Sequence, residues 1–287
     1  MTKEQILQKL LFDTRLRGLS KNTQDEYYTK VKNFQNHYDK PATELSVEDI
    51  QEYLHYLVTQ KGLSSGTVNT YNSGLRFLYN ITLEKPINIH KIPRHRKKRS
   101  IPDILTRKEV NALLGTCDNL RDKSILMIMY SAGLRISEVA SLKVSDIDSQ
   151  KMQLFIRDGK GGKDRFAILS QACLDVLREY WKQYRPADWL FYSRIQTGTH
   201  ITRRAIHNIF YKYKDLAGIT KDVSCHSLRH AFATHLLEDG VSIFHIKQLL
   251  GHSDISTTCF YLHLVKISEL NVSSPLDAPV QGDNPDA

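Results

Sequence analysis

Cysteine is scarce in this chain of 287 residues, and the four cysteines that occur lie far apart. None of Cys117, Cys173, Cys225 and Cys259 forms a C-x-x-C pair, so neither a zinc ribbon nor a disulfide framework is indicated. The sequence also lacks an apolar run long enough to cross a bilayer, and its first residues lack the apolar core of a signal peptide. We therefore expect a soluble protein of the reducing cytoplasm.

Two further kinds of motif are incomplete. Segment 158–163 is rich in glycine, but Arg157 stands where a P-loop needs glycine, and Asp164 stands where it needs serine or threonine. His226 and His230 have the four-residue spacing of helical metal ligands, yet no H-E-x-x-H motif or cysteine partner accompanies them. We predict neither a metal site nor a cofactor.

Positive charge, in contrast, is in excess. The 40 Lys and Arg residues against 31 Asp and Glu give a formal net charge of +9, which favours a polyanionic partner over an acidic small molecule. The charge is concentrated at 94–99, in a segment that Pro86, Pro93 and Pro102 keep from being one continuous helix. We interpret 84–103 as a basic interdomain linker that runs along the phosphates of a polyanionic partner. The alternative is a solvated loop.

Apolar periodicity predicts a mainly α-helical chain of two domains. Residues 1–83 indicate a bundle of four helices, of which the last three follow capping residues, namely Ser20 or Asn22 for the second helix, Ser46 for the third and Ser64 for the fourth. Residues 104–272 indicate a second domain in which helices surround a small antiparallel β-hairpin with lysines at its tip. The tail 273–287, with three prolines and few apolar residues, is expected to be disordered.

The elements expected in the second domain follow from the same patterns. One helix follows the capping box at Thr106, and another follows Asp118 or Asn119. The remaining expected elements are a helix over 134–142, hairpin strands at 152–156 and 165–169, a helix after Ser170, a short strand at 189–192, and helices over 202–216, 226–237 and 242–250.

The side chains best suited to chemistry gather between 225 and 264, where two histidines, an arginine and a tyrosine occupy short motifs. The planar guanidinium group of arginine can donate two hydrogen bonds to the oxygens of a phosphate. A tyrosine hydroxyl with a pKa of about 10 is a poor nucleophile at neutral pH unless such cations lie nearby. Each residue also has an ordinary structural interpretation. Tyr261 suits a buried core position, and Arg135 suits a helix cap or a surface pair with Glu138.

Five short motifs that contain these candidate residues follow one another along the chain in a specific order. They are Gly133-Leu-Arg-Ile-Ser-Glu138, Gly159-Lys-Gly161 in the expected hairpin, His226-Ser-Leu-Arg-His230, Leu250-Gly-His252 and, nine positions later, Tyr261. This series resembles the tyrosine recombinase, or phage integrase, family, and it is especially similar to the compact Xer-like members. The likeness covers nearly the whole chain.

The resemblance implies a C-shaped clamp around duplex DNA, with a helical core-binding domain first and a catalytic domain second. By matching position, Tyr261 would be the nucleophile, and it would form a 3′-phosphotyrosyl link and release a 5′-hydroxyl. Arg135 and Arg229 would hold the non-bridging oxygens of the phosphate. Because the covalent link conserves bond energy, rejoining would need no ATP.

The same resemblance assigns supporting roles. Lys160 would be the general acid for the leaving oxygen, and Lys163 is a competitor for this role that the family pattern alone excludes. His226 would assist proton transfer, His252 would complete the phosphate-binding set, and Glu138 would orient its neighbours. Basic residues expected to contact DNA are Arg94, Arg96, Lys97, Lys98, Arg99, Lys163, Arg203 and Arg204.

We expect a site-specific recombinase that acts as a homotetramer on two short double-stranded DNA sites, through a Holliday junction, in association with the nucleoid and with possible accessory proteins. The arm-binding domain of larger phage integrases and the extra helix of integron integrases are expected to be absent. A type IB topoisomerase and a non-catalytic DNA-binding architectural protein are the alternatives. We also expect activity to be switched by movement of the segment after Gly251. The sequence leaves open the target site, the direction of recombination and the biological role.

Overall fold

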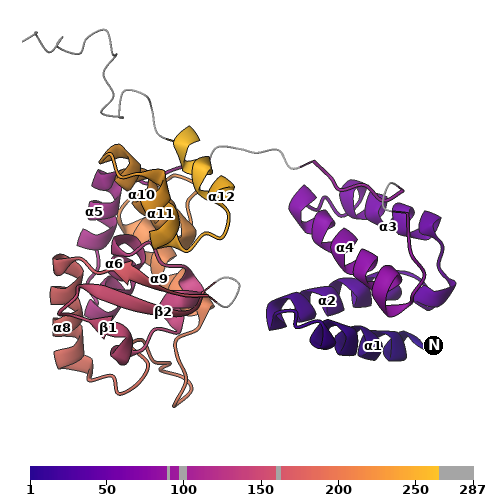
Figure 1. The fold of residues 1–287 in the computed structure, drawn as a ribbon, viewed down its shortest axis with the longest axis horizontal. Coiled ribbons are helices and arrows are strands. Elements are labelled where there is room, and N and C mark those ends of the chain that lie inside the picture. The colour runs from indigo at the N-terminus through magenta and orange to yellow at the C-terminus, as the bar shows by residue number, and fades with distance from the viewer. Residues whose placement is uncertain (89–90, 97–101, 160–162, 265–287) are drawn as a thin grey trace, which may run out of the picture. The chain divides into compact units, whose positions relative to one another are not determined.

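The structure is a computed structural model that describes residues 1–88, 91–96, 102–159 and 163–264, apart from the side chains of residues 158, 159 and 163. The chain divides into two compact units, Met1–Ser100 and Ile101–Ala287 (Figure 1). Within the described ranges, no helix is long and apolar enough to cross a membrane. The predicted fold class is confirmed, because helices predominate and the sheet found among these residues is small and antiparallel. The expected disordered tail lies outside the described residues.

The first unit contains the four predicted helices. Ser20, Ser46 and Ser64 each accept a hydrogen bond from the backbone N–H three residues later, which satisfies a donor that the helix itself leaves free. Apolar faces of all four helices meet in one core, around residues such as Phe34 and Leu75. The elements are α1 (Lys3–Leu16), α2 (Lys21–His37), the 3-10 turn η1 (Ala42–Glu44), α3 (Val47–Thr59), α4 (Ser65–Phe77) and the π-helical turn η2 (Leu78–Thr82).

Part of the segment that we interpret as a linker packs against this first unit. The side chain of Ile92 is buried in the core of the unit, and the Asn72 amide donates to the carbonyls of Ile92 and Pro93, at 3.1 Å each. The backbone N–H of His95 donates to Asn69 at 2.9 Å. The domain limits 1–83, 84–103 and 104–272 stay a prediction.

The second unit holds the sheet and the remaining helices. Its helical elements are α5 (Arg107–Gly115), α6 (Leu120–Ser131), α7 (Ile136–Ala140), the 3-10 turn η3 (Val144–Asp146), α8 (Gln171–Tyr184), α9 (Arg203–Leu216), α10 (Cys225–Glu238), α11 (Ile243–Leu250), α12 (Ile255–Cys259) and the 3-10 turn η4 (Phe260–His263). Its strands are β1 (Ile147–Asp148), β2 (Gln153–Gly159) and β3 (Lys163–Ile168), in the order β1-β2-β3. Helices α10, α11 and α12 lie together at one end of the unit (Figure 1).

The predicted hairpin is present, with Phe155 opposite Phe166 in an antiparallel register, but one strand was missed and one predicted strand is absent. Strand β1 was not predicted, because two residues are too few to show alternation. The prediction of a strand at 189–192 is wrong, because this segment forms only isolated β-bridges at Trp189 and Tyr192. Leu190 and Phe191 are buried, and a short buried apolar run does not distinguish a strand from a loop.

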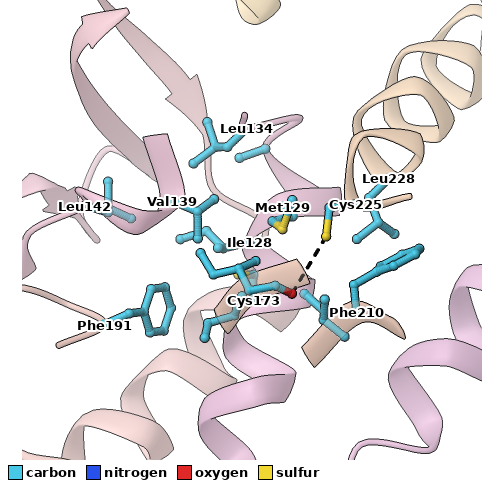
Figure 2. Close-up of a cluster of buried hydrophobic side chains, with 14 of the residues drawn as sticks. Ile128, Met129, Leu134, Val139, Leu142, Cys173, Phe191, Phe210, Cys225 and Leu228 are labelled. Atoms are coloured by element: carbon cyan, nitrogen blue, oxygen red, sulfur yellow. Dashed lines mark hydrogen bonds between the residues drawn. The ribbon is translucent and has the colours of Figure 1, made fainter. Parts of the chain in front are cut away.

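Helix α6 forms the centre of the second core. Ile128 and Met129 on this helix are fully buried and face residues from surrounding elements, among them Val139 and Phe210 (Figure 2). The Cys225 thiol donates to the Ile206 carbonyl in the same region. Burial raises the pKa of Cys225 to about 12, so this thiol is inert at neutral pH.

Gly133 allows the chain to turn sharply between α6 and α7. Its φ is +60°, and a Cβ at this position would lie 2.4 Å from the Phe232 ring. Glycine is therefore required here twice, once for the left-handed backbone and once for the close approach of α10. The turn places Arg135 at the beginning of α7.

We predict that Gly133→Ala destabilises the second unit more than Gly218→Ala does. Both positions have a left-handed backbone, which costs about 1–2 kcal/mol with a side chain, but a Cβ at Gly218 meets no atom within 4 Å. Overlap with Phe232 adds about 1–3 kcal/mol at Gly133. Thermal denaturation of the two variants measures the difference, and an equal loss in both would contradict the packing argument.

Candidate active site

Glu138 is the centre of a buried ionic cluster. It lies in the first turn of α7, where its Oε2 accepts from the backbone N–H of Arg135 and its Oε1 accepts from the Arg135 side chain, both at 2.8 Å. The predicted pair of Arg135 and Glu138 is therefore present. Because the Glu138 side chain is 4% exposed, this pair is a buried contact and not the weak surface pair of the alternative interpretation.

Arg165 on β3 holds the same carboxylate from the other side. Its Nη1 and Nη2 donate to the two Glu138 oxygens at 2.8 and 2.9 Å, and its Nε donates to the Leu249 carbonyl at 3.0 Å. Its side chain is 10% exposed and packs so tightly on Gly251 that a Cβ there would lie 2.6 Å from Cδ. Arg165 thus joins the hairpin to α7 and to the end of α11.

Opposing effects set the ionisation of Glu138. Burial alone would raise the pKa of its carboxyl, but the hydrogen bonds and charge of Arg165, followed by those of Arg135, lower it to about 2. Arg229 Nη1 lies 3.9 Å from Glu138 Oε2. We call Glu138, Arg135, Arg165 and Arg229 the Glu138 cluster. Its three guanidinium groups outweigh one carboxylate by two positive charges.

Arg229 on α10 is almost fully enclosed, at 1% exposure. Its Nη1 donates to the Gly133 carbonyl at 2.6 Å, and its Nη2 donates to the Leu250 carbonyl at 2.7 Å. Burial, and then the charge of Arg135, lowers the pKa of Arg229 to about 10, which leaves it protonated at neutral pH. The guanidinium is therefore held rigidly before any ligand binds.

His252 connects Arg229 to the segment that carries Tyr261. Arg229 Nη2 lies 3.1 Å from His252 Nε2, and since a guanidinium only donates, Nε2 accepts. The proton of the neutral ring then lies on Nδ1, which donates to Thr258 Oγ1 at 2.9 Å. Thr258 is fully buried on α12, so the short helix is linked to the cluster by a hydrogen-bond relay.

Tyr261 on η4 lies against this relay. Its ring is 2% exposed, packs in a small apolar cluster with residues such as Phe232 and Leu250, and is nearly parallel to the His252 ring at 6.3 Å between centroids. The Tyr261 hydroxyl lies 3.2 Å from His230 Nδ1. Burial raises the pKa of Tyr261, and the charges of Arg229 and Arg135 oppose this effect.

His226 lies one helical turn before His230, with ring centroids 4.6 Å apart. His226 is exposed, yet the protein atoms around its ring desolvate it, and together with Arg229 and Arg135 they lower its pKa. In the part of the chain that the structure describes, no group of three or more His, Cys, Asp or Glu residues is arranged to hold a metal ion.

The fold brings together most of the residues singled out in the sequence. Arg135, Glu138, Arg229, His252 and Tyr261 meet in one region, and the nearby ring of His226 contacts His230. Lys160 lies outside the described residues.

Of the expected DNA contacts, Arg94, Arg96, Arg203 and Arg204 are exposed, whereas Lys97, Lys98 and Arg99 and the side chain of Lys163 lie outside the described residues. Arg94 also reaches Ser73 Oγ, at 3.4 Å.

Three residues of the site were missed. Arg165 shares the inward face of β3 with Ala167, while Phe166 is 59% exposed, so the strand inverts the usual alternation of apolar and polar faces. His230 was considered only as a metal ligand, and no motif pointed to Thr258. The alternation of apolar and polar residues in β3 was the only sequence feature that could have indicated one of these residues, Arg165.

Residues 103–266 match the model of the phage integrase family, and residues 6–89 match the phage integrase N-terminal SAM-like domain. The chain belongs to the phage integrase family. It is 40% identical over 271 residues to the putative integrase/recombinase y4qK of Sinorhizobium fredii, and the match covers 94% of this chain and 88% of the relative. It is 35% identical over 260 residues to the tyrosine recombinase XerA of Pyrococcus horikoshii, across 89% of this chain and 88% of the relative. The predicted Xer-like family is confirmed.

Solved structures of recombinases and of an integrase have the same fold. The crystal structure of XerA recombinase has a TM-score of 0.55 at 27% identity and covers 93% of this chain and 96% of XerA. XerH bound to a palindromic difH substrate, in a post-cleavage complex, has a TM-score of 0.70 at 21% identity, across 86% of this chain and 78% of XerH. A lambda integrase dimer bound to a core site has a TM-score of 0.71 at 16% identity, across 91% and 77%.

We predict that Arg165→Met destabilises this integrase by about 3 kcal/mol, because it leaves the buried Glu138 carboxylate with an incomplete set of partners. Arg178→Met is the matched control. Its side chain is 55% exposed and its Nη1 lies 3.7 Å from Asp175 Oδ1, and such exposed pairs contribute about 0–1 kcal/mol. Urea denaturation measures both.

The double variant Arg165→Met with Glu138→Gln tests the cause of the loss. Removing the charge of Glu138 should restore part of the stability, because the unpaired buried anion is then absent. A double variant no more stable than Arg165→Met would show that lost packing, and not charge, explains the effect.

Proposed function

We propose that this phage integrase family member is a site-specific DNA recombinase that cleaves and rejoins DNA strands through a covalent link to Tyr261. The observation that carries the proposal is the position of the Tyr261 ring beside His252 and near Arg229, within one chain. A nucleophile and a set of phosphate-binding cations thus meet in one site. Family membership supplies the reaction class.

Arg135 and Arg229 are assigned to the two non-bridging oxygens of the scissile phosphate. A phosphodiester attacked by tyrosinate passes through an arrangement with two negative charges, and the Glu138 cluster holds two positive charges in excess of its carboxylate. The cations are fixed by protein hydrogen bonds before the substrate binds, so little reorganisation is needed. His252 is assigned to the same phosphate.

The two proton transfers need separate groups. The Tyr261 hydroxyl must lose its proton on attack, and the 5′-oxygen must gain one as it leaves. We assign Lys160 to the leaving oxygen from the family resemblance, with His226 assisting proton transfer. Glu138 keeps the orienting role that its four accepted hydrogen bonds support.

Duplex DNA is the proposed partner. The net charge of +9 suits a polyanion, and the exposed Arg203 and Arg204 lie in the first turn of α9, where cations oppose the helix dipole and so suit phosphate contact better than helix stability. The solved structures of XerH with difH and of lambda integrase with a core site contain DNA on the same fold. The first unit and residues 94–99 would complete a clamp.

The assembly of two recombination sites through a Holliday junction requires four active sites, so we propose a homotetramer on DNA, associated with the nucleoid. We further propose that the segment after Gly251 switches activity by moving Tyr261. The short elements α12 and η4 connect to the fixed arginines through the relay of His252 and Thr258, which supports this view.

We predict that the protein forms a denaturation-resistant adduct with a nicked suicide substrate and that Tyr261→Phe abolishes it, because phenylalanine has no hydroxyl to attack phosphorus. Tyr130→Phe is the matched control, since the Tyr130 hydroxyl also meets a histidine of α10, at 2.9 Å from His235 Nδ1, outside the Glu138 cluster. Denaturing gel electrophoresis of labelled DNA measures the adduct.

An adduct that survives Tyr261→Phe would overturn the assignment of the nucleophile. Tight binding without any adduct on candidate sites would favour the architectural alternative. Relaxation of supercoiled DNA by a monomer, without strand exchange between sites, would favour the topoisomerase alternative.

A further inference from the structure

His230 lies beside the proposed nucleophile but outside the set of residues assigned to the phosphate. It is on α10, directly after Arg229, and its Nδ1 is 3.2 Å from the Tyr261 hydroxyl oxygen. The two ring centroids are 5.5 Å apart.

The direction of this hydrogen bond follows from the neighbours. The Arg229 guanidinium can only donate, so it offers no acceptor to the Tyr261 hydroxyl, and its positive charge opposes the rise in the pKa of that hydroxyl that burial causes. The hydroxyl proton is then free to be donated, and among the described residues His230 Nδ1 is the acceptor within reach. The proton on the neutral His230 ring consequently lies on Nε2.

The charged groups that face His230 keep it neutral in the absence of DNA. Burial, followed by His226 and Arg229 on the same helix, lowers the pKa of His230 to about 4. From η4 it meets Tyr261, and no carboxylate of the described residues contributes to this pKa. A neutral ring has a free lone pair on Nδ1, which is what a proton acceptor requires. A bound phosphodiester adds negative charge near Arg229 and favours protonation of the ring.

We propose that His230 is the catalytic base that takes the Tyr261 proton during strand cleavage, an inference that rests on the proposed function. The O–H bond of Tyr261 breaks and an N–H bond forms at Nδ1, while the tyrosine oxygen bonds to phosphorus. The bond from phosphorus to the 5′-oxygen breaks, and that oxygen receives its proton from the separate acid. In rejoining, the 5′-hydroxyl attacks phosphorus and the imidazolium returns its proton to the departing tyrosine oxygen.

The test is the single-turnover rate of adduct formation by His230→Asn on a nicked suicide substrate, measured from neutral to alkaline pH. Asparagine places a polar atom near the position of Nδ1 but accepts no proton. We expect a loss of about 100-fold at neutral pH, within the range of general base catalysis. The loss should shrink about tenfold per pH unit as hydroxide replaces the base, since tyrosinate forms in that proportion.

His235→Asn is the matched control. His235 is on the same helix, is 5% exposed and meets the Tyr130 hydroxyl through Nδ1 in the same way. Its loss should lower stability without changing the pH dependence of the rate. If His230→Asn fails to bind DNA as the wild type does, His230→Gln is measured against the same criteria.

A substrate with sulfur in place of the bridging 5′-oxygen separates the two proton transfers, because a thiolate leaves without an acid. His230→Asn should remain slow on this substrate. Restoration of its rate would assign His230 to the leaving group and overturn the proposal, as would a wild-type rate and pH profile with the normal substrate. Absence of an adduct with the wild type itself would instead reject the proposed function.

Discussion

The candidate active site depends on the ion pairs of the buried Glu138 carboxylate with Arg135 and Arg165. An ionised group out of water is stable only when its lone pairs are satisfied, and Glu138 accepts four hydrogen bonds, two from Arg135 and two from Arg165. Through Arg165 it fixes the hairpin and the end of α11, and through Arg135 it fixes the beginning of α7. Elements that are distant in sequence therefore share one electrostatic centre.

The proposed nucleophile, Tyr261, is held by apolar packing and not by ion pairs. Tyr261 packs in a small apolar cluster between α10 and the last short elements, separate from the main core of the second unit. The helix α12 has five residues and η4 has four, so few backbone hydrogen bonds hold them, and local opening of such elements is inexpensive. The site thus combines rigidly held arginines with a tyrosine on short elements that open more easily. This arrangement suits the proposed control of cleavage by movement of Tyr261.

Local patterns predicted most of the fold. Capping boxes at Ser46 and Thr106 and apolar spacing predicted most of the helices, because these features act within a few residues, but the five-residue helix α12 was not predicted. The order of motifs indicated Arg135, Glu138, Arg229, His252 and Tyr261 through family resemblance.

The remaining features depend on contacts between distant segments, which local patterns do not contain. The contact of Arg165 with Glu138 joins a strand to a helix 27 positions away, and that of His230 with Tyr261 spans 31 positions. The two-residue strand β1 exists only because β2 lies beside it. Partners of this kind become visible only when the chain is folded.

The carbonyls at the end of α11 give Arg229 a structural role in addition to its proposed role in phosphate binding. A helix leaves its last carbonyls unpaired, and here Arg165 and Arg229 satisfy those of Leu249 and Leu250. Arg229, which is proposed to bind the phosphate, thus also caps the end of α11. A variant without Arg229 therefore leaves the Leu250 carbonyl without this partner, whereas a variant without Tyr261 keeps the end of α11 capped and loses apolar packing instead.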